Sequence, residues 1–406
     1  MSGSRSYLAK GARPTIWVRV LAITLSLALA CVVAEGGSYL AVSFLSRNPQ
    51  TKTLIYHPPS ISVMEYENYL RRRDPYLGWP SPEEMGGIRH DAFGSRRIPA
   101  FPEPGRECVT LYGDSFTYAV DVSDAEAWSN VLSRFLACRV GNFGVGGYGT
   151  DQSYLRLERN AADRAPITLL GIYPDDAIRN LTGDAYLAFG MFPASFKPRY
   201  SYSRGKLVLL PLRAVPSERL AEYSLHPERF LEDDMLLPGS PNGPVRAQFP
   251  FFLTLLRIAV SPRVRNWISG RPSWMNMYTP GDPSTGLETM QGIAEKFAAL
   301  CAARDKRCAI VLFPTPKSYA YFEKTGQSAL VGLAQALDSL GIRYLDLAPA
   351  IRRELSGRAY CDLVNAEGNC VGHFNAQGNE LVARLIYKFL LEQEDMAALV
   401  RHASRE

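Results

Sequence analysis

The sequence predicts an α/β fold in which helices cover both faces of a parallel sheet. From Glu107 onward, short apolar runs alternate with segments whose apolar residues recur at helical spacing, and this alternation is typical of parallel sheets. The composition, with 47% hydrophobic and 21% charged residues, is that of a folded protein and excludes a disordered or multi-span membrane chain. No fixed-period repeat is visible, which argues against solenoids and propellers.

The expected elements follow one another in a regular order along this part of the chain. The expected strands are 108–112, 139–142, 166–172, 308–313 and 342–347, and the expected helices are 124–137, 151–161, 287–303, 328–340 and 376–391. In the first helix, Trp128, Val131 and Leu132 share one side. Asp124 precedes it as the expected N-cap, because a short polar side chain can accept from the first free N–H groups.

The N-terminal segment 1–45 is expected to be a basic tail followed by a membrane anchor. Residues 1–19 carry basic side chains and no acid, and from Val20 to Ser46 the single charge is Glu35. This stretch can cross a bilayer, which needs about 20 apolar residues, and the basic flank predicts a cytoplasmic N-terminus. We favour an uncleaved anchor over a signal peptide cleaved near Ala28-Leu29-Ala30, a lipid-modified Cys31 or a buried soluble helix.

Cysteine usage and charge limit the compartment and the partners. Apart from Cys31 there are six cysteines, and their local arrangement suggests the pairs Cys108–Cys138, Cys301–Cys308 and Cys361–Cys370. Fifteen pairings are formally open, and buried free thiols are the alternative. Disulfides would fit an exported domain. No CxxC or histidine-rich spacing indicates zinc, and a net charge of +5 without a basic cluster does not indicate nucleic acid.

Two further segments interrupt the α/β pattern. Residues 46–105 are polar and proline-rich and are expected to be an extended leader that packs on the domain. Residues 183–285 are too long for a structureless loop, so we expect an inserted subdomain or lid. Within the insertion, 249–260 is strongly apolar. It could lie on a membrane surface beside the anchor; the alternative, which we favour, is a helix that packs onto the core.

Reactive or glycine-rich residues follow three of the predicted elements, where an open parallel sheet binds its ligands. Ser115 follows the first strand, near the start of a helix. The glycine-rich stretch 144–149 follows the second strand, and its N–H groups could face an oxyanion. His373 lies just before the last helix. A histidine base is what a weakly nucleophilic serine hydroxyl needs. The glycines do not match G-x-G-x-x-G, so nucleotide binding is not indicated.

These blocks resemble the SGNH (GDSL-type) hydrolase family. The stretch 112–117 (YGDSFT) is similar to the family's first block, 142–149 (NFGVGGYG) to its second, and His373 with Asn375 and Gly378 to its last. The closest similarity is to membrane-anchored bacterial members whose genes often accompany surface-polysaccharide synthesis. The resemblance implies a three-layer, flavodoxin-like α/β/α sandwich formed by 106–182 and 286–406.

The resemblance also implies roles for individual residues, without any metal or cofactor. Ser115 would be the nucleophile, His373 the general base, and the backbone N–H groups of Ser115 and Gly147 would bind the oxyanion. Asp175 stands where the family usually has an oxyanion-binding Asn. A carboxylate cannot donate a hydrogen bond. Either Asp175 is therefore protonated, another group such as Asn180 donates, or the oxyanion hole is weaker.

The triad acid is the second departure from the family pattern. Cys370 occupies the position of the usual Asp, three residues before the histidine. The nearest candidate is Asp362, which a Cys361–Cys370 disulfide could bring close to His373. The alternative is a Ser115–His373 dyad in which a backbone carbonyl orients the imidazole, with weaker stabilisation of the imidazolium.

The expected function is that of an exported serine esterase that crosses the bacterial cytoplasmic membrane once and has its catalytic domain on the periplasmic side. The expected substrate is an O-acyl, especially O-acetyl, group on a surface or secreted polysaccharide, which would be hydrolysed or transferred. Transfer would require a membrane protein that delivers the acyl donor. The alternative is a non-catalytic glycan-binding or assembly protein. A buried Asp362 on the imidazole would favour the enzyme, and an Asp362 that points into solvent would favour the alternative.

Overall fold

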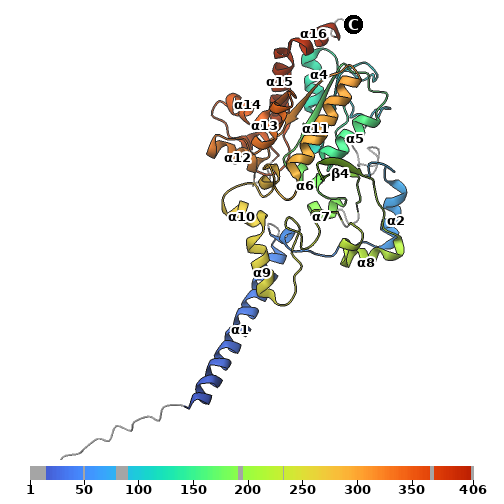
Figure 1. The fold of residues 1–406 in the computed structure, drawn as a ribbon. Helices are drawn as coiled ribbons and strands as arrows, with labels where there is room; N and C mark the ends of the chain where they lie inside the picture. The colour runs from blue at the N-terminus through green and yellow to red at the C-terminus, as the bar shows by residue number, and fades with distance from the viewer. Residues whose placement is uncertain are drawn as a thin grey trace, which may run out of the picture. The chain divides into compact units, whose positions relative to one another are not determined.

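The computed structural model describes residues 15–48, 51–78, 90–190, 195–231, 233–365 and 370–403. The chain divides into two compact units (Figure 1). The anchor unit comprises residues Met1–Tyr56 and Val245–Ala259, and the sandwich unit comprises His57–Pro244 and Val260–Glu406.

The strands are β1 (Glu107–Tyr112), β2 (Arg139–Asn142), β3 (Ile167–Ile172), β4 (Arg199–Ser203), β5 (Lys206–Leu210), β6 (Arg307–Leu312) and β7 (Tyr344–Asp346). The α-helices up to the first strand of the insertion are α1 (Ile16–Arg47), α2 (Val63–Arg72), α3 (Ser115–Tyr118), α4 (Trp128–Leu136), α5 (Thr150–Arg159), α6 (Asp176–Asn180) and α7 (Ala185–Phe189). The later α-helices are α8 (Leu220–Leu225), α9 (Phe251–Val260), α10 (Pro262–Ile268), α11 (Gly286–Ala303), α12 (Pro316–Thr325), α13 (Val331–Ser339), α14 (Leu347–Glu354), α15 (Ala376–Glu392) and α16 (Glu394–Ala403). The 3-10 turns are η1 (Lys52–Leu54), η3 (Ser217–Arg219), η4 (Pro227–Arg229), η5 (Met275–Tyr278) and η6 (Tyr360–Leu363).

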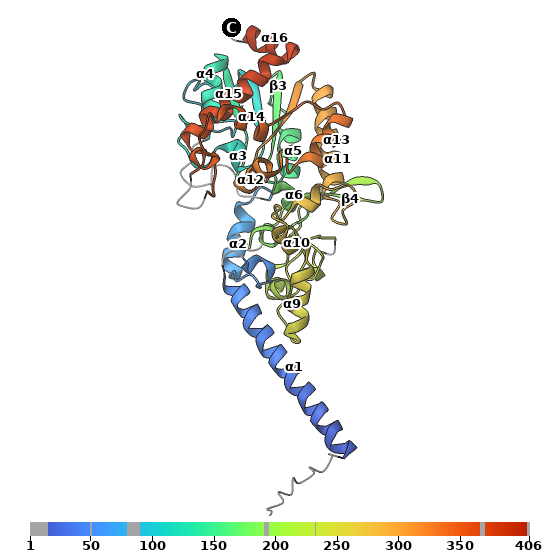
Figure 2. The ribbon, with the colours of Figure 1, turned by 90° about the vertical axis from the view of Figure 1, so that its left-hand side faces the viewer.

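The sandwich unit is built on a five-stranded sheet with the order β2-β1-β3-β6-β7, in which every neighbouring pair is parallel. Figure 2 shows α4, α14 and α15 over one face and α5, α11 and α13 over the other. This confirms the predicted α/β/α sandwich. The strand order is that of flavodoxin-like doubly wound sheets, in which ligands bind beyond the carboxyl ends of the strands.

The main hydrophobic core lies between the sheet and the layer of α4, α14 and α15. Alternate strand residues such as Val109, Leu111 and Leu169 point into it, and Trp128 is its largest fully buried side chain. The Trp128 indole N–H donates to the carbonyl oxygen of Phe116 at 3.0 Å. The core thereby fixes the short helix that follows β1.

All five predicted strands of the sheet are present, with ends that differ by at most two residues from the expected ones. Two helices begin later than predicted: α13 starts at Val331 rather than at 328, and α4 starts at Trp128 with Ala127 as its N-cap. Asp124 is therefore not the cap. Its carboxylate accepts from the Nε of the buried Arg96 at 2.8 Å, and that ion pair holds it away from the helix.

The three suggested disulfides, Cys108–Cys138, Cys301–Cys308 and Cys361–Cys370, are present, and Cys31 is a free cysteine. The Cys108–Cys138 bridge joins the start of β1 to the residue that precedes β2. The Cys361–Cys370 bridge lies in the segment that leads to His373, so it bears directly on the site described below.

The leader and the insertion contain regular elements of their own. In the leader, α2 begins with a capping box formed by Ser62 and Glu65, and Arg96 forms a bridge with Asn142 at the end of β2. The insertion contains the antiparallel hairpin β4–β5. Its part 245–259 clusters with the anchor, and the rest belongs to the sandwich unit. The domain boundaries at 46, 106, 183 and 286, and the role of 183–285 as a lid, remain predictions.

The anchor unit contains α1, which is long and apolar enough to cross a membrane. Its most apolar stretch is not buried inside the protein, which contradicts the alternative of a buried soluble helix. The basic residues Arg5, Lys10 and Arg13 lie outside the described residues. The apolar helix α9 shares this unit, and none of its residues belongs to the core of the sandwich. The expectation that α9 packs onto that core remains a prediction.

Candidate active site

The nucleophile candidate, Ser115, lies beyond the carboxyl end of β1 as the first residue of α3. Ser115 is only 7% exposed. Asp114 is the N-cap, and its Oδ1 accepts from the N–H of Phe116 at 2.8 Å. Gly113 is required before it, because a Cβ there would lie 2.0 Å from the Thr117 hydroxyl. The strand therefore turns sharply into a helix, and the serine lies at that turn.

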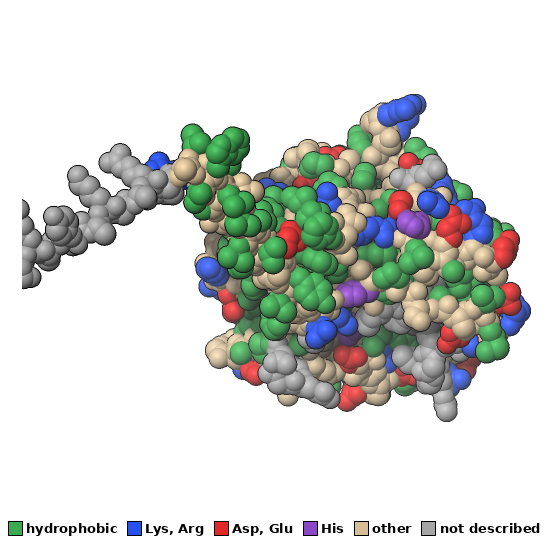
Figure 3. Space-filling model, turned by 90° about the horizontal axis from the view of Figure 1, so that it is seen from below, with side chains coloured by type: hydrophobic (Ala, Val, Ile, Leu, Met, Phe, Trp, Pro, Cys, Tyr) green, Lys and Arg blue, Asp and Glu red, His purple; other side chains and the backbone are tan. Residues whose placement is uncertain are grey.

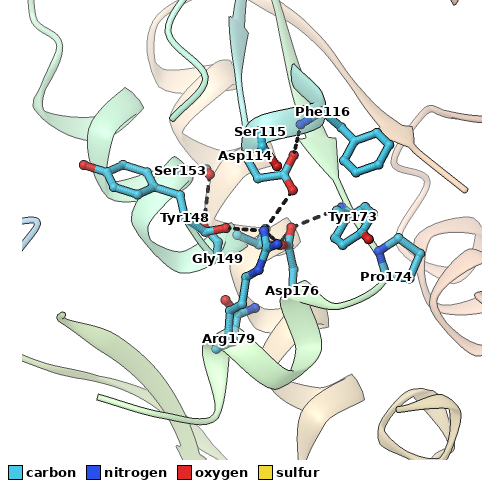
Figure 4. A network of polar contacts seen from close by, with 12 residues as sticks. Asp114, Ser115, Phe116, Tyr148, Gly149, Ser153, Tyr173, Pro174, Asp176 and Arg179 are labelled. Atoms are coloured by element: carbon cyan, nitrogen blue, oxygen red, sulfur yellow. Dashed lines mark hydrogen bonds and ion pairs between the residues drawn. The ribbon is translucent and has the colours of Figure 1, made fainter. Parts of the chain in front are cut away.

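A buried charge network holds this turn from behind (Figure 4). One guanidinium nitrogen of Arg179, which comes from α6, donates to Asp114 Oδ2 at 2.8 Å, to Asp176 Oδ1 at 3.0 Å and to the carbonyl oxygen of Tyr148 at 2.9 Å. Burial and the neighbouring Asp114 raise the pKa of Asp176, while the two carboxylates raise the pKa of Arg179. The network ties together the loops after β1, β2 and β3.

The histidine candidate reaches the serine from the loop before α15. His373 Nε2 lies 2.8 Å from Ser115 Oγ, within hydrogen-bonding reach. The His373 ring also packs on Phe116, with ring centroids 4.7 Å apart. The Asn365 N–H donates to the His373 carbonyl at 2.9 Å, and Asn375 caps α15 through the N–H of Gly378. The two residues that the sequence motifs single out are therefore brought together.

The carboxylate behind the imidazole is that of Asp121, and the predicted Asp362 does not occupy this position. Asp121 Oδ2 lies 3.2 Å from His373 Nδ1 and 3.4 Å from the His373 backbone N–H. Asp362 is exposed, and its carboxylate accepts from the Ala359 N–H at 3.1 Å. The reason is local. The Asp362 carboxylate forms a capping box at the start of η6, where it accepts from the N–H of the N-cap residue Ala359, so it does not reach the imidazole although the Cys361–Cys370 bridge is formed.

The loop that carries Asp121 is fixed by a buried arginine from the leader. Ala119 has a φ of 63°, which turns the chain out of α3. Arg96, 1% exposed, donates to the carbonyl oxygens of Tyr118, Ala119 and Val122 at 2.6, 2.5 and 2.6 Å. Three donors of one guanidinium thus hold the backbone on both sides of Asp121. The leader is therefore part of the site's support.

Two backbone groups are candidates for the oxyanion hole. Ser115 is the first residue of α3, so the helix itself offers its N–H no partner. Gly147 has a φ of 78°, in the left-handed region that glycine adopts without strain. It lies in the loop after β2, which runs beside β1 because Val145 N–H donates to the Gly113 carbonyl at 3.0 Å. Their role as oxyanion donors remains a proposal.

Of the side chains considered for a third donor, Asn180 is unsuitable. It is buried, and its amide nitrogen lies 2.8 Å from Met290 Sδ while its oxygen accepts from the Asp151 N–H. Asp175 follows β3 and precedes α6, and its side chain makes no capping hydrogen bond. Burial raises the pKa of Asp175 above its ordinary value, although nearby cations including Arg179 oppose this. A raised pKa favours the protonated form, which can donate.

Sequence reasoning missed Asp121, Arg96 and Arg179. Asp121 stands six residues after Ser115, and its signal was the short distance along the chain from the nucleophile, not a motif. Arg96 and Arg179 carry no signal in a single sequence, because their partners are backbone carbonyls and carboxylates from distant segments. Within the described residues, no group of three histidine, cysteine or acidic side chains is arranged to hold a metal ion.

No protein-family model and no curated protein match the chain. Solved structures include distant likenesses. A member of the lipolytic protein G-D-S-L family from Veillonella parvula DSM 2008 is 11% identical over 69% of this chain and 96% of its own, with a TM-score of 0.32. A catalytic mutant of Axe2, an acetylxylan esterase from Geobacillus stearothermophilus, is 12% identical over 70% and 93%, with a TM-score of 0.35.

A two-domain esterase active on acetylated mannans is 11% identical over 70% of this chain and 49% of its own, with a TM-score of 0.34. At these identities and TM-scores, the likenesses are too distant to carry a conclusion about this chain. The roles proposed below therefore rest on the contacts among Ser115, His373 and Asp121.

Proposed function

We propose that this protein is an exported, membrane-anchored serine esterase that acts on O-acyl groups of a glycan. The observation that carries the proposal is the continuous chain of contacts from Ser115 Oγ to His373 Nε2, at 2.8 Å, and from His373 Nδ1 to Asp121, at 3.2 Å. Nucleophile, base and orienting carboxylate are arranged in this way in serine hydrolases of unrelated folds.

The geometry supports acyl transfer through a covalent intermediate. Ser115 Oγ attacks the ester carbonyl carbon while His373 Nε2 takes the hydroxyl proton, and Asp121 stabilises the resulting imidazolium. The oxyanion is bound by the N–H groups of Ser115 and Gly147. When the tetrahedral intermediate collapses, His373 returns the proton to the leaving alcohol oxygen. Water then attacks the acyl-serine with His373 again as base, which releases the carboxylic acid and free Ser115.

The exposure of the site supports a large substrate. Ser115 is buried, but the side chains of His373 and Asp121 are 26% and 34% exposed, so the catalytic groups lie near the surface. An acyl group that projects from a polymer can reach such a site without the polymer entering a deep cavity. The choice of an acetylated surface or secreted polysaccharide comes from the sequence resemblance and is an analogy.

The proposed location follows from α1 and the disulfides. One apolar N-terminal helix could serve as an anchor, and three disulfides are typical of an oxidising compartment. We place the catalytic domain on the periplasmic side of the bacterial cytoplasmic membrane. If the acceptor is a sugar hydroxyl rather than water, a second membrane protein would have to deliver the acyl donor.

The test uses the full-length protein, purified in detergent under oxidising conditions, and an aryl acetate as substrate. Ser115→Ala and His373→Ala should each abolish hydrolysis above background, because each removes a group that forms or breaks a bond. Ser123→Ala is the matched control, since Ser123 is an exposed serine that contacts Glu126. Equal slow rates in all four proteins would overturn the proposal and favour the non-catalytic glycan-binding alternative.

That alternative rested on a site without a triad acid. Asp362 is indeed exposed, which was the criterion in its favour. Asp121 supplies the missing carboxylate from a different loop, so the exposure of Asp362 no longer argues against catalysis. The Asp175 substitution remains its only support from the residues of the site.

A further inference from the structure

The helix α9 in the anchor unit exposes an unusual number of large apolar side chains. Phe252, Leu253 and Leu256 are 54%, 45% and 49% exposed, and Phe249, just before the helix, is 74% exposed. Residues 252, 253 and 256 share one side of a helix. Single apolar residues scattered over a surface are ordinary, whereas a contiguous exposed apolar surface marks a site that binds a protein or a membrane.

The beginning of α9 is attached to α1 through Glu35, the single acid of the apolar stretch. The N–H of Phe251 donates to Glu35 Oε2 at 2.7 Å, and the N–H of Phe252 donates to Oε1 at 3.3 Å. Tyr39, one turn further along α1, packs edge-on against the Phe251 ring at 5.1 Å between centroids. The first N–H groups of a helix have no partner within the helix, and here they donate to the Glu35 carboxylate. Lipid offers that carboxylate no hydrogen-bond donor.

The position of Glu35 along α1 gives the depth at which α9 begins. Arg19 and Glu35 are 16 residues apart in one helix, which is about 24 Å at 1.5 Å per residue. The hydrocarbon core of a bilayer is about 30 Å thick. If Arg19 marks the cytoplasmic edge, Glu35 lies inside the hydrocarbon near its outer edge. The residues between Glu35 and Arg47 add about 18 Å of uncharged helix.

We propose that α9 is a second membrane-contacting element, which lies in the outer leaflet against α1 and inserts its apolar side into lipid. The occupant of this surface is a lipid bilayer, because the surface is continuous with α1, whose apolar side chains are exposed along its length (Figure 3). The exposed Arg257 is compatible with this depth, since its long side chain can extend to the headgroups. The inference rests on the proposal that α1 spans the membrane.

The test places nitroxide labels on the full-length protein in vesicles of phosphatidylethanolamine and phosphatidylglycerol. Cys31 is first replaced, as Cys31→Ser, because it is the free cysteine. Labels are then attached at Leu256→Cys in α9, Leu27→Cys in α1 and Leu225→Cys in α8, positions that are 49%, 62% and 54% exposed. Collision rates are measured with oxygen, which concentrates in lipid, and with a water-soluble nickel chelate.

We expect the ratio of oxygen to nickel collisions to be several-fold higher at Leu256 than at Leu225, and comparable to that at Leu27. A lipid-like value at Leu27 with a water-like value at Leu256 would overturn the inference and leave the anchor proposal intact. Protection of Leu256 from both reagents would also overturn it, because protein, as a second copy or another partner, would then cover α9. Water-like values at Leu27 as well would overturn both proposals. Esterase activity of the labelled proteins tests neither and reports only on the sandwich unit.

The contact with Glu35 gives a second, independent readout. Glu35→Ala should make the Leu256 label more mobile and more accessible to nickel, because the two N–H groups at the start of α9 lose their acceptor. Glu35→Gln is the matched control, since its amide oxygen can still accept. An unchanged label in Glu35→Ala would show that Glu35 does not hold α9 at this depth.

Discussion

The two sides of the active site are built in different ways. Ser115 is fixed by buried charges, through Asp114 and Arg179, beneath a sharp strand-to-helix turn. His373 lies three residues after the Cys361–Cys370 bridge, and its side chain and that of its carboxylate partner are both partly exposed. The serine side is therefore coupled to the stability of the sandwich, whereas the His373 and Asp121 side chains can be replaced with little effect on folding.

This difference predicts which substitutions lower the stability of the protein and which lower its activity. Removing a group from the buried side leaves an uncompensated buried charge, which costs folding free energy. Removing a group from the exposed side leaves a charge or donor that water can solvate. Substitutions of the partly exposed His373 and Asp121 side chains should therefore cause large changes in activity with small changes in stability.

The largest expected effect is that of Asp121→Ala on activity. Loss of the carboxylate leaves the imidazole unoriented and its positive form without a partner, so kcat/KM should fall roughly 10³- to 10⁴-fold. The melting temperature should change little, because Asp121 is partly exposed. Steady-state hydrolysis of an aryl acetate, with thermal unfolding alongside, measures both quantities.

Asp362→Ala is the matched control for that experiment. Asp362 is also an exposed aspartate, and it is the residue that the sequence analysis named as the candidate acid. Its kcat/KM should stay within about twofold of the wild-type value, since the contact of its carboxylate within the described part of the chain is with the Ala359 N–H, at 3.1 Å. A large loss in Asp362→Ala together with an active Asp121→Ala would reverse the assignment of the acid.

On the buried side, Arg179→Met should reduce the free energy of unfolding by roughly 3–5 kcal/mol, because Asp114 and Asp176 would lose their shared cation. The control is Arg384→Met, which removes an exposed pair with Glu380 and should cost less than about 1 kcal/mol. Denaturant unfolding measures the difference. Equal stabilities of the two variants would mean that the network does not support the nucleophile turn.

Most of the fold was predictable because burial leaves a periodic trace in one sequence. The strands 107–112 and 167–172 are almost wholly buried apolar runs, and α4 repeats its buried residues Trp128, Val131 and Leu132 at helical spacing. The start of α4 was not predictable. Asp124 resembles a cap locally, and only the distant Arg96 shows that its carboxylate is used elsewhere.

The same reason explains which part of the site could be predicted. Ser115 and His373 stand in local motifs, so their neighbours in sequence identify them. Asp121 and His373 are 252 residues apart, and their contact at 3.2 Å depends on how two loops meet at the sheet edge. A family spacing predicted an acid close to the histidine in sequence. Asp121 meets the same electrostatic need from a loop adjacent to the nucleophile.

The disulfide of the histidine loop allows stability and activity to be separated. Replacing both Cys361 and Cys370 with alanine should cost roughly 2.5 kcal/mol, as expected for a short closed loop. It should also lower kcat/KM about tenfold, because small displacements of a base are costly. The control is the double alanine variant of Cys301 and Cys308, a loop of similar length with the same stability loss and unchanged kcat/KM. If the two double variants have the same kcat/KM, the Cys361–Cys370 bridge does not help to position His373.

The last expected effect, similar in size to that of the bridge on activity, concerns Asp175 and depends on pH. Burial raises the pKa of Asp175, so the proton that would let it donate to an oxyanion is retained to higher pH than in an ordinary carboxyl group. Activity that depends on this donor should decline as the pH rises through that pKa. Asp175→Asn supplies an amide donor at every pH, so its kcat/KM should exceed that of the wild type by about tenfold on the alkaline side.

Asp175→Ala separates this explanation from a general effect of charge. Alanine removes the negative charge but donates nothing, so it should lack the alkaline gain of Asp175→Asn, and at low pH it should fall below the wild type. The full comparison is a profile of kcat/KM against pH for the three proteins. If asparagine and alanine give the same profile, Asp175 influences the site only through its charge. The proposed oxyanion hole would then consist of the Ser115 and Gly147 N–H groups alone, whose backbone the buried network holds in place.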